Sequence, residues 1–170
     1  DFDLARIEKL GVEFRYNTTV STSDLEPLKE QFDAVFIGAG LWKPKTLDLP
    51  GKNLDGVVHA LDYLQNARRY EPSEKGNRVV VIGDGDVAMD CATTAQALGA
   101  ESVKLVFCRP IAEASANIAE TLLAVSMGIP VVTEFFPQKI NGKNGRVTDI
   151  HFTGADRQSV MNLQTDKVIL

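Results

Sequence analysis

Residues 78–99 read RVVVIGDGDVAMDCATTAQALG. A run of β-branched residues at 78–82 leads into the glycine-rich segment 83–88, and apolar residues then recur at helical spacing until Gly99. Residues 103–107 form a second short apolar run, as expected for a buried strand. A strand, a turn, a helix and a second strand within about 30 residues predict a βαβ crossover in a parallel sheet.

The turn has the pattern Gly83-x-Gly85-x-x-Ala88, which in this strand-to-helix context is typical of dinucleotide binding. Gly83 permits the sharp turn, Gly85 removes a side chain that would block a pyrophosphate, and Ala88 lets the helix pack closely on the strand. The free amides at the helix start would bind the anion, and Asp86 could cap the helix. The alternative is a glycine-rich turn that binds nothing. We predict a nicotinamide dinucleotide at the six residues of the turn, which are Gly83, Asp84, Gly85, Asp86, Val87 and Ala88.

The end of the second strand bears on the choice between NAD and NADP. In NAD-binding domains an acidic residue about 20 residues after the turn bonds the ribose 2′-hydroxyl. This chain has no carboxylate there but carries Arg109, whose guanidinium could hold a 2′-phosphate. The residue favours NADP(H) over NAD(H), and a solvated arginine is the alternative.

Composition excludes several classes of protein. Of the 170 residues, 44% are hydrophobic and 24% charged, as in an ordinary globular protein, and the net charge is −5. An acidic chain lacks the basic surface that nucleic acids or anionic membranes require, and no apolar run approaches the roughly 20 residues of a membrane span. Cys91 and Cys108 are too few for a disulfide framework or cluster, so we expect two buried thiols in the reducing cytoplasm. His59 and His151 match no catalytic role, and we predict no metal site and assign no catalytic residue.

The amino-terminal part has its own pattern. The chain opens with Asp-Phe-Asp, and we expect it to be a piece of a longer protein. A helix over 4–10 is predicted to end at Gly11, and strands are predicted over 12–20 and 32–37. The second strand breaks at Gly38, Ala39 and Gly40, where glycines would let a ligand or another backbone come close.

Residues 43–77 contain repeated prolines and glycines and look like a connector, helical only over 60–70. Beyond the crossover we predict a helix over 114–127 and strands over 130–136, 147–152 and 167–170, with a turn within 141–145. Two parts of the chain thus share one order of predicted elements: a helix, a glycine, a strand, and later a short apolar strand preceded by Asp. The predicted fold is α/β: the rear of one dinucleotide domain at 1–42, a connector at 43–77, and a Rossmann-like domain at 78–170.

Five segments carry a resemblance to a known family. They are GVEFRYNTTV, FDAVFIGAGLWKPKTLDLPG, ALDYL, VVVIGDGDVAMDCATTAQALGAESVKLVFCR and GRVTDIHF. Together they resemble the small subunit of NADPH-dependent glutamate synthase. The turn and its helix also resemble dihydropyrimidine dehydrogenase, of the same superfamily of pyridine nucleotide-disulfide oxidoreductases.

The resemblance implies that residues 43–170 form an NAD(P)-binding domain of the glutathione-reductase type, a parallel sheet with a β-meander, inserted into an FAD-binding domain. Residues 1–42 would precede the insertion, with Gly38, Ala39 and Gly40 contributing to cofactor binding. In such proteins NADPH gives hydride to FAD, and electrons leave through iron–sulfur clusters, here outside this chain. The implied partners are the remainder of the parent oxidoreductase or a large subunit.

The chain departs from the family at two places. Further basic residues usually follow the arginine matching Arg109, but this chain has Pro110, Ile111 and Ala112. Asp84 stands where glycine or alanine is common. An alternative function of another class is a dinucleotide-sensing or assembly module without redox chemistry, because fold alone does not decide function.

Overall fold

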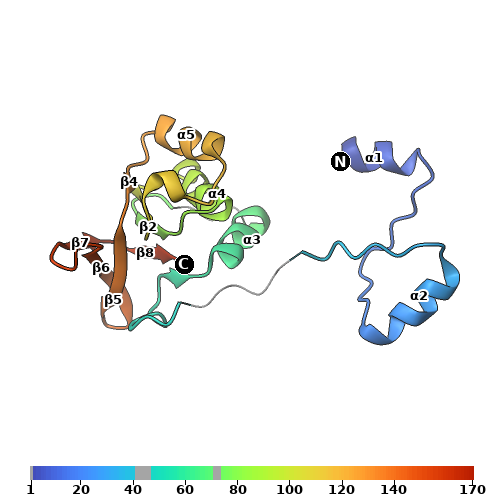
Figure 1. Cartoon of the computed structure of the whole chain (residues 1–170), viewed down its shortest axis with the longest axis horizontal. Coiled ribbons are helices and arrows are strands. Elements are labelled where there is room, and N and C mark those ends of the chain that lie inside the picture. The colour runs from blue at the N-terminus through green and yellow to red at the C-terminus, as the bar shows by residue number, and fades with distance from the viewer. Residues whose placement is uncertain (1, 41–46, 71–73) are drawn as a thin grey trace. The chain divides into compact units, whose positions relative to one another are not determined.

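A computed structural model of the chain describes residues 2–40, 47–70 and 74–170. It consists of two compact units, residues 1–40 and residues 41–170, and Figure 1 shows the elements of both. In the described ranges, no helix is long and apolar enough to cross a membrane.

The first unit contains three short helices: α1 (Phe2–Glu8), the 3₁₀ helix η1 (Thr22–Asp24) and α2 (Leu25–Gln31). Gly11 follows α1 with a φ of +88°, the left-handed conformation that commonly ends a helix. The predicted helix over 4–10 is present but begins and ends two residues earlier. None of the described residues of this unit is buried.

The two strands predicted in the first unit, over 12–20 and 32–37, are absent from its described residues, so that prediction was wrong. A strand needs a neighbour to satisfy its backbone N–H and C=O groups, and residues 2–40 contain no paired strand. The apolar side chains that suggested burial are instead exposed, Phe36 by 94% and Ile37 by 68%. The apolar pattern of these two segments indicates side chains that favour burial, but within the first unit they are not buried.

The second unit is built on a five-stranded parallel sheet with the order β1-β8-β2-β3-β4. The parallel pairing of β2 with β3 around α4 confirms the predicted βαβ crossover. The strands of this sheet are β1 (Val57–Val58), β2 (Arg78–Ile82), β3 (Ser102–Val106), β4 (Val131–Val132) and β8 (Lys167–Ile169). The helices between them are α3 (Ala60–Tyr70), α4 (Asp86–Ala97), the 3₁₀ helix η2 (Ile111–Glu113) and α5 (Ile118–Ser126).

The sheet is covered on both faces, which explains why its central strand β2 is continuously apolar over residues 79–82. Val79 and Val81 pack with residues of α4 in one buried cluster, whereas Val80, between them, packs in a second cluster with the antiparallel strands. Those strands, β5 (Phe135–Lys143), β6 (Arg146–Gly154) and β7 (Val160–Gln164), form the predicted meander. Helices, parallel sheet and meander are thus three layers, as Figure 1 shows.

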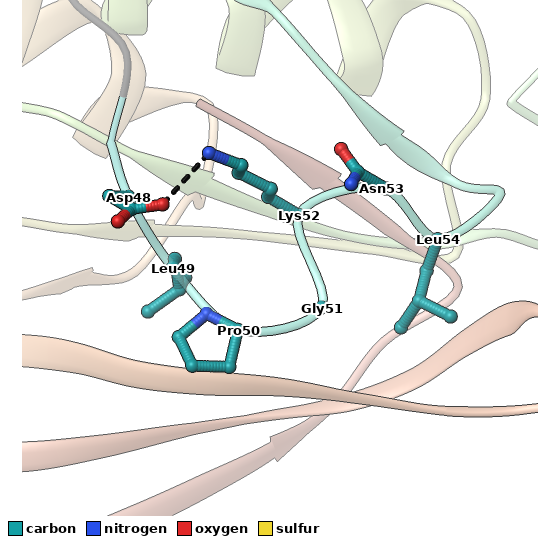
Figure 2. Close-up of a pocket in the computed structure, with 7 residues that line it drawn as sticks. All are labelled: Asp48, Leu49, Pro50, Gly51, Lys52, Asn53 and Leu54. Carbon is teal, nitrogen blue, oxygen red and sulfur yellow. Dashed lines mark hydrogen bonds and ion pairs between the residues drawn. The ribbon is translucent and has the colours of Figure 1, made fainter.

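Residues 43–77, expected to connect two domains, contribute elements to the second unit. They contain β1, which pairs with β8, and α3, which packs on α4. The loop 48–54 lines a shallow pocket beside the meander (Figure 2). Gly51 (φ +89°) lies so close to β5 that an added Cβ would be 2.1 Å from the Ile140 carbonyl oxygen. Leu49 is buried in the same layer.

Several other elements differ from the predictions. The strand predicted over 130–136 is split into β4 and β5, with Glu134 at a φ of +63° between them. The helix predicted over 114–127 begins only at α5, where the Asn117 side chain accepts a hydrogen bond from the Ala119 amide. The sequence patterns did not predict β1, β7, α2 or the 3₁₀ helices η1 and η2. The predicted turn in 141–145 is the hairpin turn Asn144–Gly145, both residues having positive φ.

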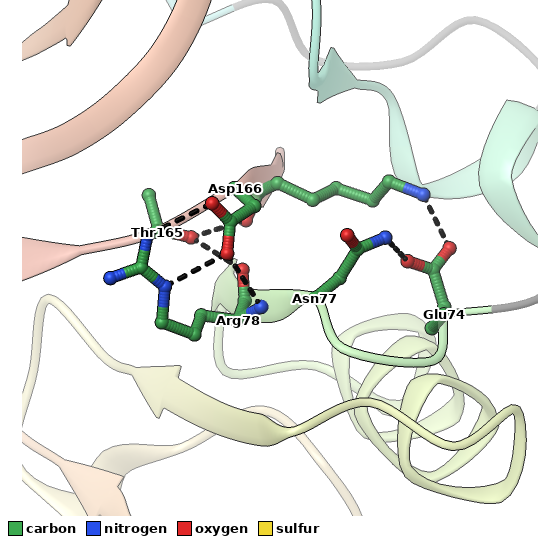
Figure 3. A network of polar contacts seen from close by, with 6 residues as sticks. Glu74, Asn77, Arg78, Thr165 and Asp166 are labelled. Atoms are coloured by element: carbon green, nitrogen blue, oxygen red, sulfur yellow. Dashed lines mark hydrogen bonds and ion pairs between the residues drawn. The ribbon is translucent and has the colours of Figure 1, made fainter.

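A polar network joins the amino-terminal ends of β2 and β8 (Figure 3). Arg78 donates through Nε and Nη2 to the two carboxylate oxygens of Asp166, at 2.8 and 2.9 Å. The fully buried Glu74 carboxylate is paired with the Lys167 ammonium and accepts from Asn77 Nδ2 at 2.8 Å. This network lies at the edge of the sheet opposite the glycine-rich turn and secures the chain entering β2.

Candidate dinucleotide-binding site

The glycine-rich turn lies at the carboxyl end of β2, between its neighbours β8 and β3 in the sheet. From β2 the chain continues to β3 on one side, while β8, which comes last in the sequence, pairs on the other. Such a reversal of strand order leaves a crevice at the carboxyl ends of the strands, where ligands of open α/β sheets bind.

Gly83 adopts a φ of +147°, which a residue with a side chain rarely adopts. A Cβ added there would lie 3.2 Å from the Ala88 Cβ, so turn and helix are in close contact. Gly83 and Ala88 therefore have the geometry expected from the sequence, a sharp turn and a tight approach of α4 to β2.

A groove of about 490 Å³ opens in front of the turn. Its walls come from the ends of β2 and β8, from the turn, and from the first residues of α3 and α4; they are Ala60, Leu61, Val81, Ile82, Gly83, Asp84, Gly85, Val87, Ala88, Ile169 and Leu170. The Ala60 amide donates to the Leu170 carbonyl at 2.9 Å, which holds the start of α3 beside β8. The groove is thus bounded by two helix amino termini, where backbone dipoles favour an anion.

The turn fits a pyrophosphate by shape. An added Cβ at Gly85 would have one neighbour within 4 Å, the Ser115 Oγ at 3.4 Å, so no backbone atom fills the space in front of this glycine. Gly85 is the N-cap of α4 and has no side chain to cap the helix. The amides of Asp86 and Val87 begin the helix, where N–H groups have no intrahelical acceptor.

The idea that Asp86 caps α4 was wrong. Its carboxylate accepts instead from the backbone amide of Asn117, at 2.7 Å, and so ties α4 to the start of α5. Asp86 therefore leaves the first amides of α4 available to a ligand.

Arg109 follows β3, as predicted, but its guanidinium has an acidic neighbour. Nε of Arg109 lies 2.6 Å from Oδ2 of Asp84, which stands between the two glycines of the turn. The arginine side chain is 54% exposed and the aspartate side chain 15%. The ion pair offsets the negative charge that Asp84 would otherwise bring to an anion site.

The loop before α5 adds residues that sequence reasoning missed. Ser115 Oγ donates to Asp84 Oδ1 at 2.9 Å, and the Ala116 amide donates to the Asp84 carbonyl at 2.7 Å. The order of the strands could have indicated these residues. The loop follows β3, the neighbour of β2, and therefore begins at the same edge of the sheet as the glycine-rich turn.

Gly38, Ala39 and Gly40 belong to the first unit, whereas the groove belongs to the second. Gly40 has a φ of +71°, as expected where the backbone turns sharply. Their proposed share in cofactor binding stays a prediction.

The cysteines and histidines bring no reactive group to the groove. Cys91 is buried, as expected, but Cys108 is only partly buried because it lies just beyond the end of β3, so the expectation of two buried thiols was wrong for Cys108. Burial raises the pKa of Cys91 to about 12 and also raises the pKa of Cys108, so both thiols stay protonated near neutral pH. His151 pairs with Asp149 at 3.1 Å on the meander. His59 precedes α3, and its buried Nδ1 has no hydrogen-bond partner among the described residues.

Comparison with known proteins shows which proteins this chain resembles. The family model described as pyridine nucleotide-disulphide oxidoreductase matches residues 4–170. The NAD-dependent dihydropyrimidine dehydrogenase subunit PreT of Escherichia coli (strain K12) is 32% identical over 100% of this chain and 40% of its own length. The glutamate synthase (NADPH) small chain of Halomonas elongata is 40% identical over 62% of this chain and 25% of its own length. The chain therefore spans less than half the length of these relatives.

A crystal structure of T. acidophilum thioredoxin reductase superposes with a TM-score of 0.62, covering 74% of this chain and 39% of that one. At 19% identity this likeness concerns the fold alone, which is the dinucleotide-binding fold of the glutathione-reductase type. The family model covers nearly the whole chain, and its name agrees with the resemblance seen in the sequence. The chain belongs to the pyridine nucleotide-disulphide oxidoreductase family.

Proposed function

We propose that this chain binds NAD(P)H in the groove at residues 83–88 and presents it to FAD in a longer oxidoreductase similar to the small subunit of glutamate synthase. The observation that carries the proposal is the turn itself. Its glycines leave space for a pyrophosphate at the carboxyl end of β2, between the amino termini of α3 and α4.

The residues of the groove have two roles in this proposal. The amides at the start of α4 bind the pyrophosphate, and no side chain at Gly85 obstructs them. Leu61, Val87 and Leu170 supply apolar walls for the flat rings of the dinucleotide. When bound, the nicotinamide supplies a hydride, and the protein holds and orients the dinucleotide.

NADPH is the proposed preference, because Arg109 at the end of β3 provides a cation and residues 107–110 there include no carboxylate to bind a ribose hydroxyl. The named relatives include both an NADPH and an NAD-dependent protein. The preference is therefore a matter of individual side chains around the groove and not of the fold.

We assign residues 1–42 to the FAD-binding domain that precedes the insertion. Exposed apolar side chains such as Phe36 and Ile37 support this, because they suit strands that pair in a larger sheet. In this proposal the FAD glycine turn, the iron–sulfur clusters and the acceptor site belong to the remainder of the parent oxidoreductase or to a large subunit. We propose that the assembly acts in the cytoplasm, without nucleic-acid or membrane partners.

Titrating the chain with NADPH, followed by nicotinamide fluorescence, tests the binding step. We expect saturation at one dinucleotide per chain and no flavin absorbance in the purified chain, since its sequence has a single Gly-x-Gly-x-x-Ala turn. The transfer step is tested in the full-length protein by anaerobic mixing with NADPH, which should bleach the flavin. Binding without bleaching would contradict hydride transfer and favour a dinucleotide-sensing or assembly module.

A further inference from the structure

Both carboxylate oxygens of Asp84 have partners on the segment that follows β3. Oδ2 lies 2.6 Å from Nε of Arg109, and Oδ1 accepts from Ser115 Oγ at 2.9 Å. The backbone joins the same contact, since the Asp84 carbonyl accepts from the Ala116 amide at 2.7 Å. Asp84 thereby fixes the strand-end arginine against the glycine-rich turn.

This arrangement gives Arg109 two competing anionic partners whenever a 2′-phosphate enters the site. The Asp84 side chain is only 15% exposed, so the carboxylate is held in place, while the guanidinium, at 54%, remains accessible to a ligand. A phosphate that reaches Arg109 must share a cation that Asp84 already neutralises. NADH, which lacks the phosphate, avoids this competition.

We propose that Asp84 is a specificity-determining residue, whose carboxylate holds Arg109 and weakens binding of the 2′-phosphate, so that the groove discriminates only weakly between NADPH and NADH. The inference rests on the proposed function of the groove. It assigns the choice of cofactor to the pair Asp84–Arg109 and not to the arginine alone.

The ratio of the dissociation constants of NADPH and NADH isolates this effect. Asp84 also stands close to the expected position of the pyrophosphate, but that group is common to both cofactors and cancels in the ratio. Asp84→Asn keeps the size of the side chain and an oxygen that can accept from Ser115, while it removes the charge. We expect the ratio to shift toward NADPH by about tenfold, as expected for releasing one charge-assisted bond.

Four further variants complete the experiment, in which calorimetric titration measures the two dissociation constants. Asp90→Asn changes an exposed residue of α4; it makes the same charge change away from Arg109 and should leave the ratio unaltered. Asp84→Asn combined with Arg109→Ala should show no gain over Arg109→Ala alone, because the arginine mediates the effect. Asp84→Ala, which removes the carboxylate altogether, replaces Asp84→Asn if that variant does not fold.

The outcomes separate the two hypotheses. If the wild-type chain binds neither dinucleotide, the proposed function and this inference both fail. If it binds them but the ratio stays constant in folded Asp84 variants, or shifts equally without Arg109, the inference alone is overturned. A shift toward NADPH that requires Arg109 and is absent in Asp90→Asn supports it.

Discussion

Replacing Gly85 with valine should abolish dinucleotide binding and leave the fold intact. Gly85 has φ −103° and ψ 170°, an extended conformation that β-branched residues adopt readily. Its added Cβ would be 3.4 Å from Ser115 Oγ, an ordinary contact. We therefore expect the free energy of unfolding to change by less than about 1 kcal/mol.

The effect on binding should be much larger. The valine methyl groups would occupy the space through which a pyrophosphate approaches the first amides of α4. Loss of two charge-assisted hydrogen bonds, each worth about 1.5–3 kcal/mol, removes at least about 3 kcal/mol of binding free energy. The dissociation constant of NADPH should then rise by more than about a hundredfold.

Calorimetric titration with NADPH measures the affinity, and circular dichroism with urea denaturation checks the fold. Ala97→Val, at the exposed end of the same helix, is the matched control and should bind normally. A folded Gly85→Val chain whose NADPH dissociation constant stayed within about threefold of wild type would refute the reasoning, since the pyrophosphate would have to lie elsewhere.

Arg109→Ala should weaken NADPH by no more than about tenfold, since Asp84 already neutralises the arginine, and should alter NADH little, as measured by calorimetry, because the 2′-phosphate distinguishes them; equal weakening of both would mean that the arginine supports the shape of the site. Hydrogen bonds from Arg78 lower the pKa of Asp166 to about 2, below its unfolded value near 3.9, so this pair stabilises the fold above about pH 4 and ceases to do so as the pH falls to about 2. After screening of this partly exposed pair, Asp166→Asn should cost about 1 kcal/mol at pH 7 in urea denaturation and almost nothing near pH 2; a cost independent of pH would contradict the ion pair as its source. Glu74→Ala should lower the free energy of unfolding by about 3 kcal/mol because it strands the Lys167 ammonium, whereas Glu74→Leu with Lys167→Met should be near wild type; equal losses in both would show that packing, not charge, is what matters there.

Local patterns predicted the elements whose formation depends on neighbours in the sequence. The run 78–82, the glycine at 83 and the helical spacing after it specify β2, the turn and α4 without reference to the rest of the chain. Asn144–Gly145 likewise requires a hairpin turn by its backbone preferences.

Prediction failed where a segment depends on a distant partner. The patterns at 12–20 and 32–37 are those of strands, but no strand in the described residues of the first unit pairs with them. The very short β1 escaped detection for the converse reason, because two residues carry no pattern and its existence depends on pairing with β8.

The candidate site divides in the same way. The turn from Gly83 to Ala88 could be predicted from the sequence, because six consecutive residues are enough to specify a tight strand-to-helix turn. The environment of Arg109 was decided by tertiary structure: parallel pairing of β2 and β3 brings Asp84 to its guanidinium and Ser115 to the turn. The partners of a charged side chain are fixed only when the sheet assembles, so the ion pair between Asp84 and Arg109, to which we assign the choice of cofactor, could be found only in the folded chain.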